Sequence, residues 1–461
     1  MVRRIAVIGG GIAGLAAAVR LRDRAPSGTE IVVYEQSGRL GGKLCTGELG
    51  GLAVERGAES FLAGDPAGGE SAAVALARRA GLELAHPARV PAAIAAGGAL
   101  LPMPAGTLLG VPGDPAALPP LAHATAEPDT AGPLLAEGAD VAVGELVRAR
   151  LGDEVVDRLV DPLLGGVYAG HADQLSLAVT MPALAAAARR TGSLVAAVRA
   201  AQAAAVRAPG APVFAAPAGG MSALVAAVAA TSGATIATGH TVREVARTPT
   251  GWRLTLGPVP APATADVDGV VLAVPAKAAS RLLARVDACA AHTTGLLDYA
   301  SVALVGLALP AGADLPHLSG FLVPAVEGRL VKAATFLTTK WPHLGAGATI
   351  VRASVGRYGD EAQLQLPDDE LAAAVHRDLG DLLGAALPAP AGTFVQRWGG
   401  ALPQYTPGHL DRVAAVRAAL AAAAPGLAVA GAAFDGVGIP ACVRSGEAAA
   451  EHVLKTLEGP R

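Results

Sequence analysis

The sequence predicts a mixed α/β protein in which a Rossmann-like domain, built from separated segments, joins a mixed-sheet domain and a helical subdomain. Three observations predict this fold class. The chain opens on a buried strand, a glycine-rich turn and a helix; its middle carries charges at helical spacing; and its second half holds further strand-like runs. With 461 residues the chain also exceeds the usual size of one domain.

The N-terminal segment has the pattern of a βαβ unit. Residues 5–8 form an apolar, strand-like run, and residues 9–14 form a glycine-rich turn. Helical spacing over residues 15–21 is followed by a second apolar strand at residues 31–34. This order predicts two parallel strands joined by a helix.

The rest of the chain divides into loop-rich, helical and strand-like stretches. Residues 87–135 are rich in Pro, Gly and Ala, which favours loops and short helices in an inserted region. Residues 137–163 and 182–206 carry charges on one helical face and predict a helical subdomain. Later runs predict an antiparallel ribbon (235–256), buried strands (269–274, 302–309 and 349–355) and a charged helix (368–383).

Charge and cysteine content exclude two classes. The net charge is −3, from 36 Lys and Arg against 39 Asp and Glu, and no basic run occurs, so nothing favours a nucleic-acid partner. Cys45, Cys289 and Cys442 lie far apart without a CxxC pair, which argues against a disulfide scaffold and a structural metal site. A reducing, cytoplasmic location is expected.

The apolar runs do not predict a membrane span. The first residues enter a strand directly, which leaves no space for a cleavable signal peptide. The longest charge-free apolar run, residues 418–434, is broken by Pro425 and Gly426. At most, a peripheral membrane contact is expected.

The strongest motif is the G-x-G-x-x-G of residues 9–14, placed between a strand and a helix. Gly9 permits a tight turn, Gly11 carries no Cβ that would block a pyrophosphate, and Gly14 lets the helix approach the strand. The N-terminal N–H groups of the helix then face the phosphates. An ordinary glycine-rich turn is the alternative, which the flanking pattern disfavours.

Glu35 ends the second strand, about twenty residues past the glycines as the dinucleotide fingerprint requires. A carboxylate there accepts hydrogen bonds from ribose hydroxyls and repels a 2′-phosphate, so NADP is disfavoured. Without the glycines, a solvated acid at a strand end would be the default interpretation.

Two further segments extend this site. Gly38-Arg39-Leu40-Gly41-Gly42-Lys43 resembles the second glycine motif of FAD-binding oxidases of the amine-oxidase superfamily, where it approaches the pyrophosphate and the flavin. Residues 431–440, with 445–448 beyond, resemble the segment that closes the FAD site in that superfamily. A glycine-rich terminal loop is the alternative interpretation.

Several stretches narrow the resemblance to the protoporphyrinogen/coproporphyrinogen oxidases of haem synthesis. They are residues 55–62 (ERGAESFL), 101–107 (LPMPAGT), 166–170 (GVYAG) with 175–177, and 396–398 (QRW) with 402–405 (LPQY) and 408–409. The resemblance runs from residue 1 to about 455. It is strongest to the soluble Gram-positive enzymes that act on coproporphyrinogen III.

The resemblance implies three parts. An FAD-binding domain comprises residues 1–64, 206–275 and 395–461, and a substrate-binding domain comprises residues 65–90 and 276–394. A helical domain at residues 91–205 covers the substrate. Helical spacing in this last region agrees with the resemblance.

The resemblance also implies site residues. FAD would contact Gly9, Gly11, Ile12, Ala13, Gly14, Glu35, Gln36, Arg39, Gly41, Gly42, Lys43, Gly57, Ala58, Val242, Trp398, Gly431, Val437, Gly438 and Ile439. The substrate would contact Gly166 and Tyr168. Hydrophobic packing in a ribbon explains Val242 equally well.

The implied reaction removes six electrons from a porphyrinogen in three hydride-type transfers to the flavin, with molecular oxygen as acceptor and hydrogen peroxide as product. Because the cofactor carries the difficult step, no catalytic side chain and no metal are expected. His171 and His409 could be proposed as proton shuttles, but loop histidines satisfied by neighbouring backbone are favoured.

A tetracarboxylate substrate needs cations around an apolar site, and the candidates are Arg56, Arg89, Lys332 and Lys340. The chain departs from its relatives at residues 63–69, which are acidic and glycine-rich where basic residues are frequent. It also has His171 where an acid is frequent, and Ala433 where amine oxidases commonly hold an acid.

Other functions remain open at this level. Protoporphyrinogen IX is the alternative substrate, and an amine oxidase, a carotenoid desaturase or a broad amino-acid oxidase shares the glycine motifs. A non-catalytic flavin or porphyrin carrier is an alternative of another class. Pathway logic alone suggests a transient contact with a ferrochelatase.

Overall fold

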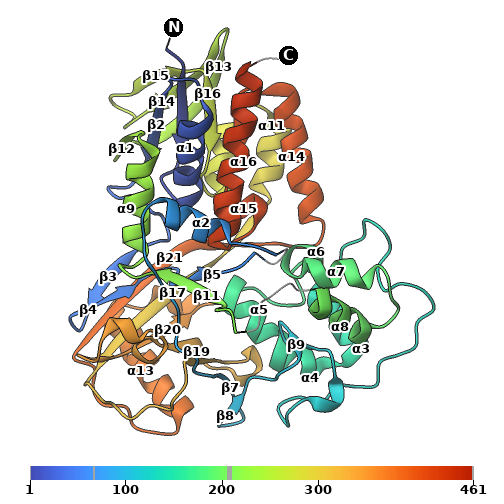
Figure 1. Ribbon diagram of the computed structural model, residues 1–461. Coiled ribbons are helices and arrows are strands. Elements are labelled where there is room, and N and C mark those ends of the chain that lie inside the picture. Colours follow the sequence, from blue (N-terminus) through green and yellow to red (C-terminus); the bar gives the residue numbers. More distant parts are fainter. Residues whose placement is uncertain (1, 66–67, 205–209, 459–461) are drawn as a thin grey trace.

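The computed structural model describes residues 2–65, 68–204 and 210–458. Both termini lie at one end, in an elongated part built around a parallel sheet (Figure 1). The other end is broader and contains a second sheet beside a group of short helices. The predicted mixed α/β class is confirmed.

A five-stranded parallel sheet forms the centre of the elongated part. Its order is β12 (Thr235–Thr238), β2 (Glu30–Glu35), β1 (Arg4–Ile8), β16 (Gly269–Leu272) and β22 (Leu427–Val429). The predicted strands at 5–8, 31–34 and 269–274 are therefore confirmed. The ribbon predicted from residue 235 is wrong at its start, because β12 pairs in parallel with β2 and alternation alone does not distinguish a parallel edge strand.

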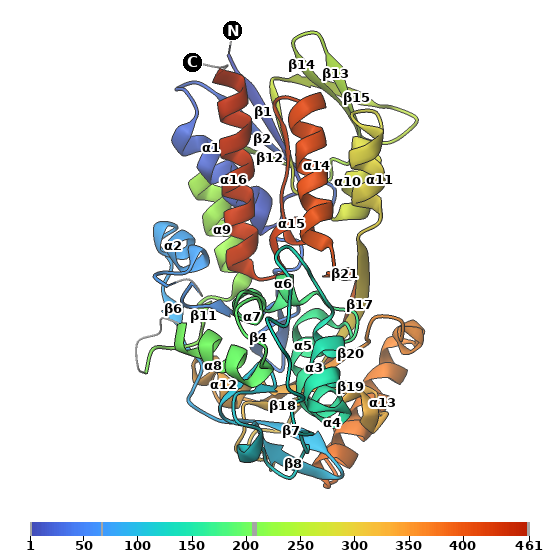
Figure 2. The same ribbon diagram turned by 90° about the vertical axis from the view of Figure 1, so that its right-hand side faces the viewer.

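Side chains alternate between two layers along β1. Ile5 and Val7 pack with the helices of one face, and Ala6 and Ile8 with the elements of the other. The first layer contains α1 (Ile12–Arg24), α9 (Met221–Ser232) and α16 (Ile439–Glu458) (Figure 2). The second contains β13 (Val242–Thr248), β14 (Gly251–Leu256), β15 (Ala263–Val267), α10 (Ala276–Leu283), α11 (Ala288–Gly295) and α14 (His409–Ala423).

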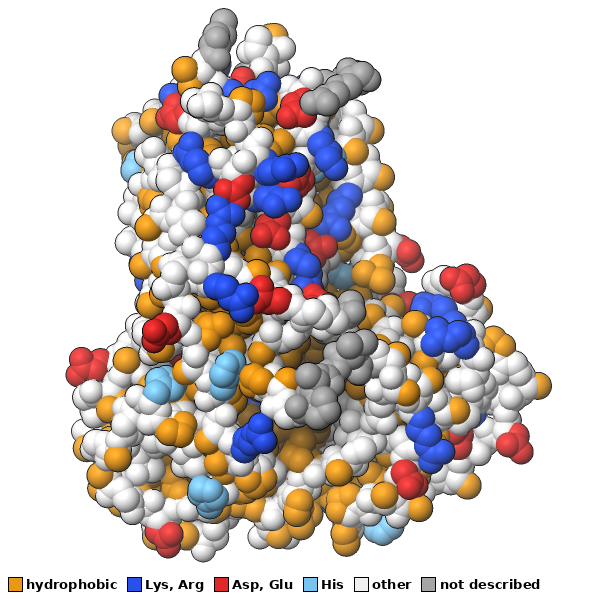
Figure 3. Space-filling view, in the orientation of Figure 1, with side chains coloured by type: hydrophobic (Ala, Val, Ile, Leu, Met, Phe, Trp, Pro, Cys, Tyr) orange, Lys and Arg blue, Asp and Glu red, His pale blue; other side chains and the backbone are white. Residues whose placement is uncertain are grey.

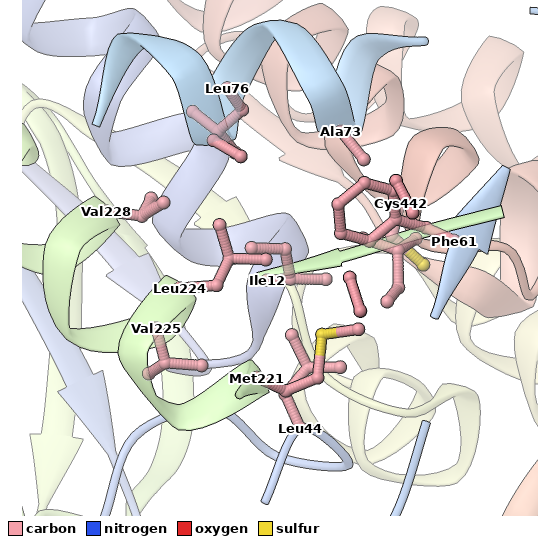
Figure 4. Close-up of a cluster of buried hydrophobic side chains, with 14 of the residues drawn as sticks. Ile12, Leu44, Phe61, Ala73, Leu76, Met221, Leu224, Val225, Val228 and Cys442 are labelled. Atoms are coloured by element: carbon pink, nitrogen blue, oxygen red, sulfur yellow. The ribbon is translucent and has the colours of Figure 1, made fainter. Parts of the chain in front are cut away.

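A buried apolar cluster fixes the start of α1 against segments from the whole chain. Figure 4 shows Ile12 of α1 and Leu44 beside Met221 and Leu224 of α9, with Phe61 and Cys442 closing the cluster. Helix α2 (Ala72–Arg79) covers it with Ala73 and Leu76. Three distant parts of the sequence thus hold the glycine turn in place.

A seven-stranded sheet forms the second domain. Its order is β21 (Gly392–Gln404), β17 (Asp298–Leu309), β20 (Thr349–Val355), β19 (Val331–Phe336), β18 (Gly320–Leu322), β7 (Ala92–Ala96) and β8 (Ala99–Pro102). The predicted helix α13 (Asp368–Leu383) is confirmed and covers one face. Strands β7 and β8 correct the expectation that residues 91–102 belong to the helical part, because β7 pairs with β18.

The helical part has its own apolar core, in which Val147, Leu164 and Leu184 are fully buried. It contains α3 (Val143–Leu151), α4 (Asp153–Val155), a π-helical turn (Val156–Val160), α5 (Asp161–Tyr168), α6 (Leu177–Thr180), α7 (Pro182–Ala188) and α8 (Leu194–Ala204). The two helical stretches are confirmed, but the expected boundary at residues 205–206 lies outside the described residues.

Shorter elements connect these parts. They are β3 (Thr46–Leu49), β4 (Leu52–Glu55), β5 (Phe61–Leu62), β6 (Leu84–Ala85), β9 (Thr107–Leu108), β10 (Val111–Pro112), β11 (Phe214–Pro217), α12 (Leu337–Lys340), α15 (Ala432–Asp435) and 3-10 turns at Pro115–Ala117, Ala325–Glu327, Pro342–Leu344 and Ala362–Gln365. The Pro- and Gly-rich region 87–135 thus holds short strands as well as loops.

Within the described part of the chain, no helix is both long and apolar enough to cross a membrane. On the face seen in Figure 3, positive and negative side chains intermix over the elongated part. Ion pairs of the elongated part include Arg20 with Glu451 and Arg79 with Asp23.

Candidate functional site

The turn after β1 leaves open space at its middle glycine. Gly9 has φ +108°, and a Cβ there would lie 2.3 Å from the carbonyl oxygen of Ala273. A Cβ on Gly14 would lie 2.0 Å from the carbonyl oxygen of Gly9. A Cβ on Gly11 meets no protein atom within 4 Å. The fold therefore requires the first and third glycines, whereas Gly11 borders space that a ligand can fill.

Helix α1 begins at Ile12 without a capping side chain, since Gly11 precedes it. The N–H groups of Ile12 and Ala13 lie in the first turn, where a helix offers no internal acceptors. Together with the positive end of the helix dipole, they suit the phosphates of a dinucleotide.

Glu35 holds the same turn from the neighbouring strand. Its carboxylate accepts hydrogen bonds from the backbone N–H of Gly10 and of Ser37, each at 2.8 Å. Each carboxylate oxygen keeps a second lone pair that a ribose hydroxyl can use. Gln36 follows in an exposed position.

The second glycine motif lies directly against the first. Gly41 donates a 2.8 Å hydrogen bond to the carbonyl oxygen of Gly10, and a Cβ on Gly42 would lie 3.7 Å from the Cα of Gly11. Arg39 stabilises this loop by donating to the carbonyl oxygen of Gly42 at 2.7 Å. The structure thus brings together two motifs that are thirty residues apart in sequence.

Lys43 adds a cation to this loop. Burial lowers the pKa of its ammonium group. Among the described residues it forms neither an ion pair nor a side-chain hydrogen bond. A positive group held without a protein partner suits an anionic ligand beside the glycine turn.

Gly57, Ala58 and Trp398 meet next to Lys43. A Cβ on Gly57 would lie 1.9 Å from the carbonyl oxygen of Lys43, which also accepts a 3.2 Å hydrogen bond from the N–H of Ala58. The indole Nε1 of Trp398 donates to the carbonyl oxygen of Arg56 at 2.7 Å. Strand β21 of the second domain thereby contributes to the site.

The C-terminal segment reaches the same place. A Cβ on Gly431 would lie 3.8 Å from the Cβ of Ala13, and the N–H of Gly431 donates a 2.8 Å hydrogen bond to the hydroxyl of Ser445. Val437 and Gly438 then lead into α16 at Ile439. The first and last segments of the chain thus lie side by side, as expected for the two ends of one site.

Val242 lies near the C-terminal end of β2. The N–H of His240 donates to the carbonyl oxygen of Glu35 at 2.9 Å, which brings the start of β13 to the end of β2. A register shift follows Val242 in the pairing of β13 with β14. The backbone at Val242 is therefore near Glu35, where the adenine half of a dinucleotide would lie.

Gly166 and Tyr168 occupy a different place, on α5 of the helical part. A Cβ on Gly166 would lie 3.2 Å from the side chain of Leu322 on β18. The ring of Tyr168 packs edge-on against Tyr405 at 5.8 Å, and the Tyr405 hydroxyl donates to the carbonyl oxygen of Ala432 at 2.5 Å. Burial raises the pKa of Tyr168 to about 12, so its phenol stays neutral. These aromatic contacts connect α5 to the C-terminal segment.

A buried charge network was missed from the sequence. Glu59 forms ion pairs with Arg352 and Lys340. Their charges outweigh the effect of burial and lower the pKa of Glu59 to about 2. Arg352 also donates to the carbonyl oxygens of Glu55 at 2.9 Å and Gly57 at 3.2 Å. No local pattern links partners separated by nearly three hundred residues.

The two histidines lie in different surroundings. His409 is buried, and neither ring nitrogen makes a hydrogen bond of normal geometry in the described structure. The backbone of Ala433 makes a weak contact with the ring. Burial lowers the pKa of His409 to about 4. His171 Nδ1 instead lies 3.8 Å from a carboxylate oxygen of Asp161. The ring of His409 thus has only the Ala433 backbone as a polar contact among the described residues, whereas the ring of His171 lies beside a carboxylate instead of backbone.

A cavity of about 450 Å³ is lined by residues of α14, β22 and α16. Its walls include Arg417, Asp435 and Arg444, and none of the predicted flavin contacts lines it. Arg417 pairs with Asp435, and Arg444 with Asp65. Because these polar groups are paired and no glycine motif opens there, the glycine turn identifies the cofactor site better than this cavity does.

The chain belongs to the flavin containing amine oxidoreductase family, whose model matches residues 12–454. The cradle around Gly11, the helix N-terminus and the unpaired Lys43 fit a flavin dinucleotide. The protein is accordingly an FAD-dependent oxidoreductase.

Relatives match nearly the whole chain. It is 38% identical over 474 residues to the coproporphyrinogen III oxidase of Mycobacterium tuberculosis, covering 99% of this chain and 98% of the relative. The Bacillus subtilis protein of the same name is 32% identical, with coverages of 99% and 98%. The crystal structure of "Putative protoporphyrinogen oxidase" from Exiguobacterium sp. 255-15 has a TM-score of 0.84 at 30% identity, covering 98% and 99% of the two chains.

The fold extends beyond these relatives. Cyclohexylamine oxidase from Brevibacterium oxydans has a TM-score of 0.69 at 18% identity, with coverages of 99% and 100%. That likeness supports the shared architecture alone.

Proposed function

We propose that this protein oxidises coproporphyrinogen III to coproporphyrin III in haem biosynthesis. The observation that carries the proposal is near full-length similarity to two proteins named coproporphyrinogen III oxidase, at 38% and 32% identity. In this reaction three molecules of oxygen take up six electrons and six hydrogens and leave as three molecules of hydrogen peroxide. FAD, when bound, accepts each hydride from the macrocycle.

In this proposal the chain's own residues bind and orient. The glycine turn, Glu35, residues 39–43 and residues 431–439 hold the cofactor, and Gly57, Ala58 and Trp398 border its flavin end. Gly166 and Tyr168 face the substrate from α5. The three-part domain division, with β7 and β8 in the substrate-binding part, belongs to the same proposal. So do a cytoplasmic location and a transient ferrochelatase contact, which rest on the sequence resemblance.

Incubation of FAD-loaded protein with chemically reduced coproporphyrinogen III is expected to generate porphyrin fluorescence together with peroxide. Three equivalents of peroxide per porphyrin are expected from the electron balance. Parallel fluorimetry and a peroxidase-coupled assay measure both products. A flavin-loaded protein that produced neither would refute the oxidase proposal and favour a carrier.

The substrate preference is a separate prediction. We expect kcat/KM to be higher with coproporphyrinogen III than with protoporphyrinogen IX, because the resemblance is strongest to enzymes that act on the tetracarboxylate. Turnover of both compounds at matched concentrations measures the preference. Faster turnover of the divinyl compound would reassign the substrate while leaving the oxidase chemistry in place.

A further inference from the structure

The four cations suggested by the sequence as carboxylate anchors have different environments. Lys340 is paired with the buried Glu59. Arg89 is exposed and donates to the carbonyl oxygen of Gly210 at 2.8 Å. The guanidinium of Arg56 lies 5.0 Å from the ring centre of Phe394 and donates a hydrogen bond to the carbonyl oxygen of Glu48 in β3. Lys332 alone among the four is both buried and without any polar side-chain contact to the described residues.

Lys332 is an unusual core residue. It is 5% exposed, although lysine is rarely buried without an acidic partner. Burial and the nearby charge of Arg357 lower the pKa of Lys332 to about 7. The charged form is thus held at a free-energy cost that an anion would relieve.

A strand irregularity positions this lysine. The pairing of β19 with β20 shifts register between Val331 and Ala333, so Lys332 occupies a β-bulge. Bulges re-aim a side chain and are common beside functional sites. The carbonyl oxygen of Lys332 accepts a 2.9 Å hydrogen bond from the N–H of Val323, which ties the bulge to the end of β18.

Arg357 provides a second cation at this place. Its guanidinium donates to the carbonyl oxygen of Val323 at 2.9 Å and, within the described residues, forms no ion pair within 4.0 Å. Burial lowers the pKa of Arg357, and the more distant charges of Asp161 and Asp360 only partly oppose this effect. The two cations therefore share Val323 as a neighbour and lack a bonded carboxylate.

Asp161, one of the two acids whose charge acts on Arg357, already has other contacts. Asp161 accepts a 2.8 Å hydrogen bond from the N–H of Ala172 and lies 3.8 Å from His171. Its pKa is raised, chiefly by burial, which favours the neutral carboxyl. Within the described residues, neither Lys332 nor Arg357 forms an ion pair with this carboxyl group.

This positive pair lies beside the proposed substrate contact. Leu322 directly precedes Val323 and is the side chain that a Cβ on Gly166 would meet at 3.2 Å. Helix α5 packs against β18 and β19 at this junction. We propose that Lys332 and Arg357 form a binding subsite for one ionised carboxylate of the tetrapyrrole substrate, an inference that rests on the proposed function.

The subsite has a positioning role. A carboxylate that accepts charge-assisted hydrogen bonds from the ammonium and guanidinium groups fixes one edge of the macrocycle relative to α5. The bulge of β19 supplies the ammonium group of this anchor.

The test compares Lys332→Met and Lys332→Arg in FAD-loaded protein, with Lys455→Met at an exposed position as the matched control. Fluorescence titration measures the dissociation constant for coproporphyrin III and for its uncharged tetramethyl ester. Lys332→Met is expected to weaken coproporphyrin III binding on the order of 10- to 100-fold, and Lys332→Arg to restore most of it. Ester binding should not change, and KM should rise more than kcat falls.

Unchanged coproporphyrin III binding in Lys332→Met would overturn the subsite, as would an equal loss for the ester, which indicates a packing defect. If the Lys332 variants lose FAD or fold poorly, Arg357→Gln is expected to show the same selective loss of the tetracarboxylate. A wild-type protein that bound coproporphyrin III through Lys332 without oxidising the porphyrinogen would refute the proposed function alone.

Discussion

Replacement of Gly11 by valine is expected to abolish FAD retention while the protein still folds. Gly11 has φ −74° and ψ 174°, an extended conformation that valine adopts readily. A Cβ there meets no protein atom within 4 Å, so the side chain would enter only the space proposed for the pyrophosphate. The flavin absorbance of the purified variant, with its thermal unfolding curve, measures both expectations.

Gly347→Val is the matched control, because a Cβ at Gly347 also meets no protein atom within 4 Å. Gly347 lies in the loop before β20, outside the glycine motifs. The control should retain flavin. A Gly11→Val protein that remained yellow would contradict the assigned cradle, whereas valine at Gly9 or Gly14 would be uninformative because a Cβ there clashes with backbone.

Replacement of Glu59 by glutamine is expected to lower the free energy of unfolding by roughly 3–5 kcal/mol, because it leaves the half-buried cations of Arg352 and Lys340 without their counter-ion. The loop at Gly57 and Ala58 depends on the same Arg352. Denaturant unfolding of both proteins measures the difference. Asp266→Asn removes an exposed pair with Arg253 and should change stability little.

The effect of Glu59 also has a defined pH dependence. Its folded-state pKa of about 2 lies below the ordinary value of 4.5, so its stabilising contribution is present above the ordinary value. This contribution is lost as the pH falls toward 2. The difference between wild type and Glu59→Gln should therefore be constant near neutrality and shrink in acid. An equal difference at all pH values would show that the carboxylate charge is not responsible.

The local sequence pattern was sufficient to predict the elements whose own residues specify a helix, a strand or a turn. The strand, glycine turn and helix at the N-terminus combine apolar runs with a required turn residue, and Asp368–Leu383 has clear helical spacing. Residues 235–238 were misassigned because a four-residue run at an edge does not specify its partner strand. Residues 92–102 were misassigned because composition favours loops there, whereas pairing with β18 supplies the strand's hydrogen bonds.

Long-range electrostatics could not be predicted. The sequence offers Lys332 and Lys340 equally as candidate carboxylate anchors. Among the described residues, Lys332 lies unpaired in a β-bulge, whereas Lys340 is paired with Glu59. Burial and the distance to an opposite charge determine the difference, and both depend on tertiary packing. The glycine motifs were predictable because a tight turn or a close approach of backbone requires a residue without a Cβ, and this requirement arises within a short segment.

The proposed oxidation of a porphyrinogen requires that FAD, bound by the glycine turn, Glu35 and residues 39–43 of this chain, would supply the redox chemistry with oxygen as acceptor. Anaerobic mixing of FAD-loaded protein with reduced coproporphyrinogen III, followed by admission of oxygen, tests it most directly. We predict that the flavin absorbance bleaches before oxygen is admitted and recovers afterwards, together with porphyrin fluorescence and peroxide. Flavin that stayed oxidised in the presence of the porphyrinogen would contradict the account.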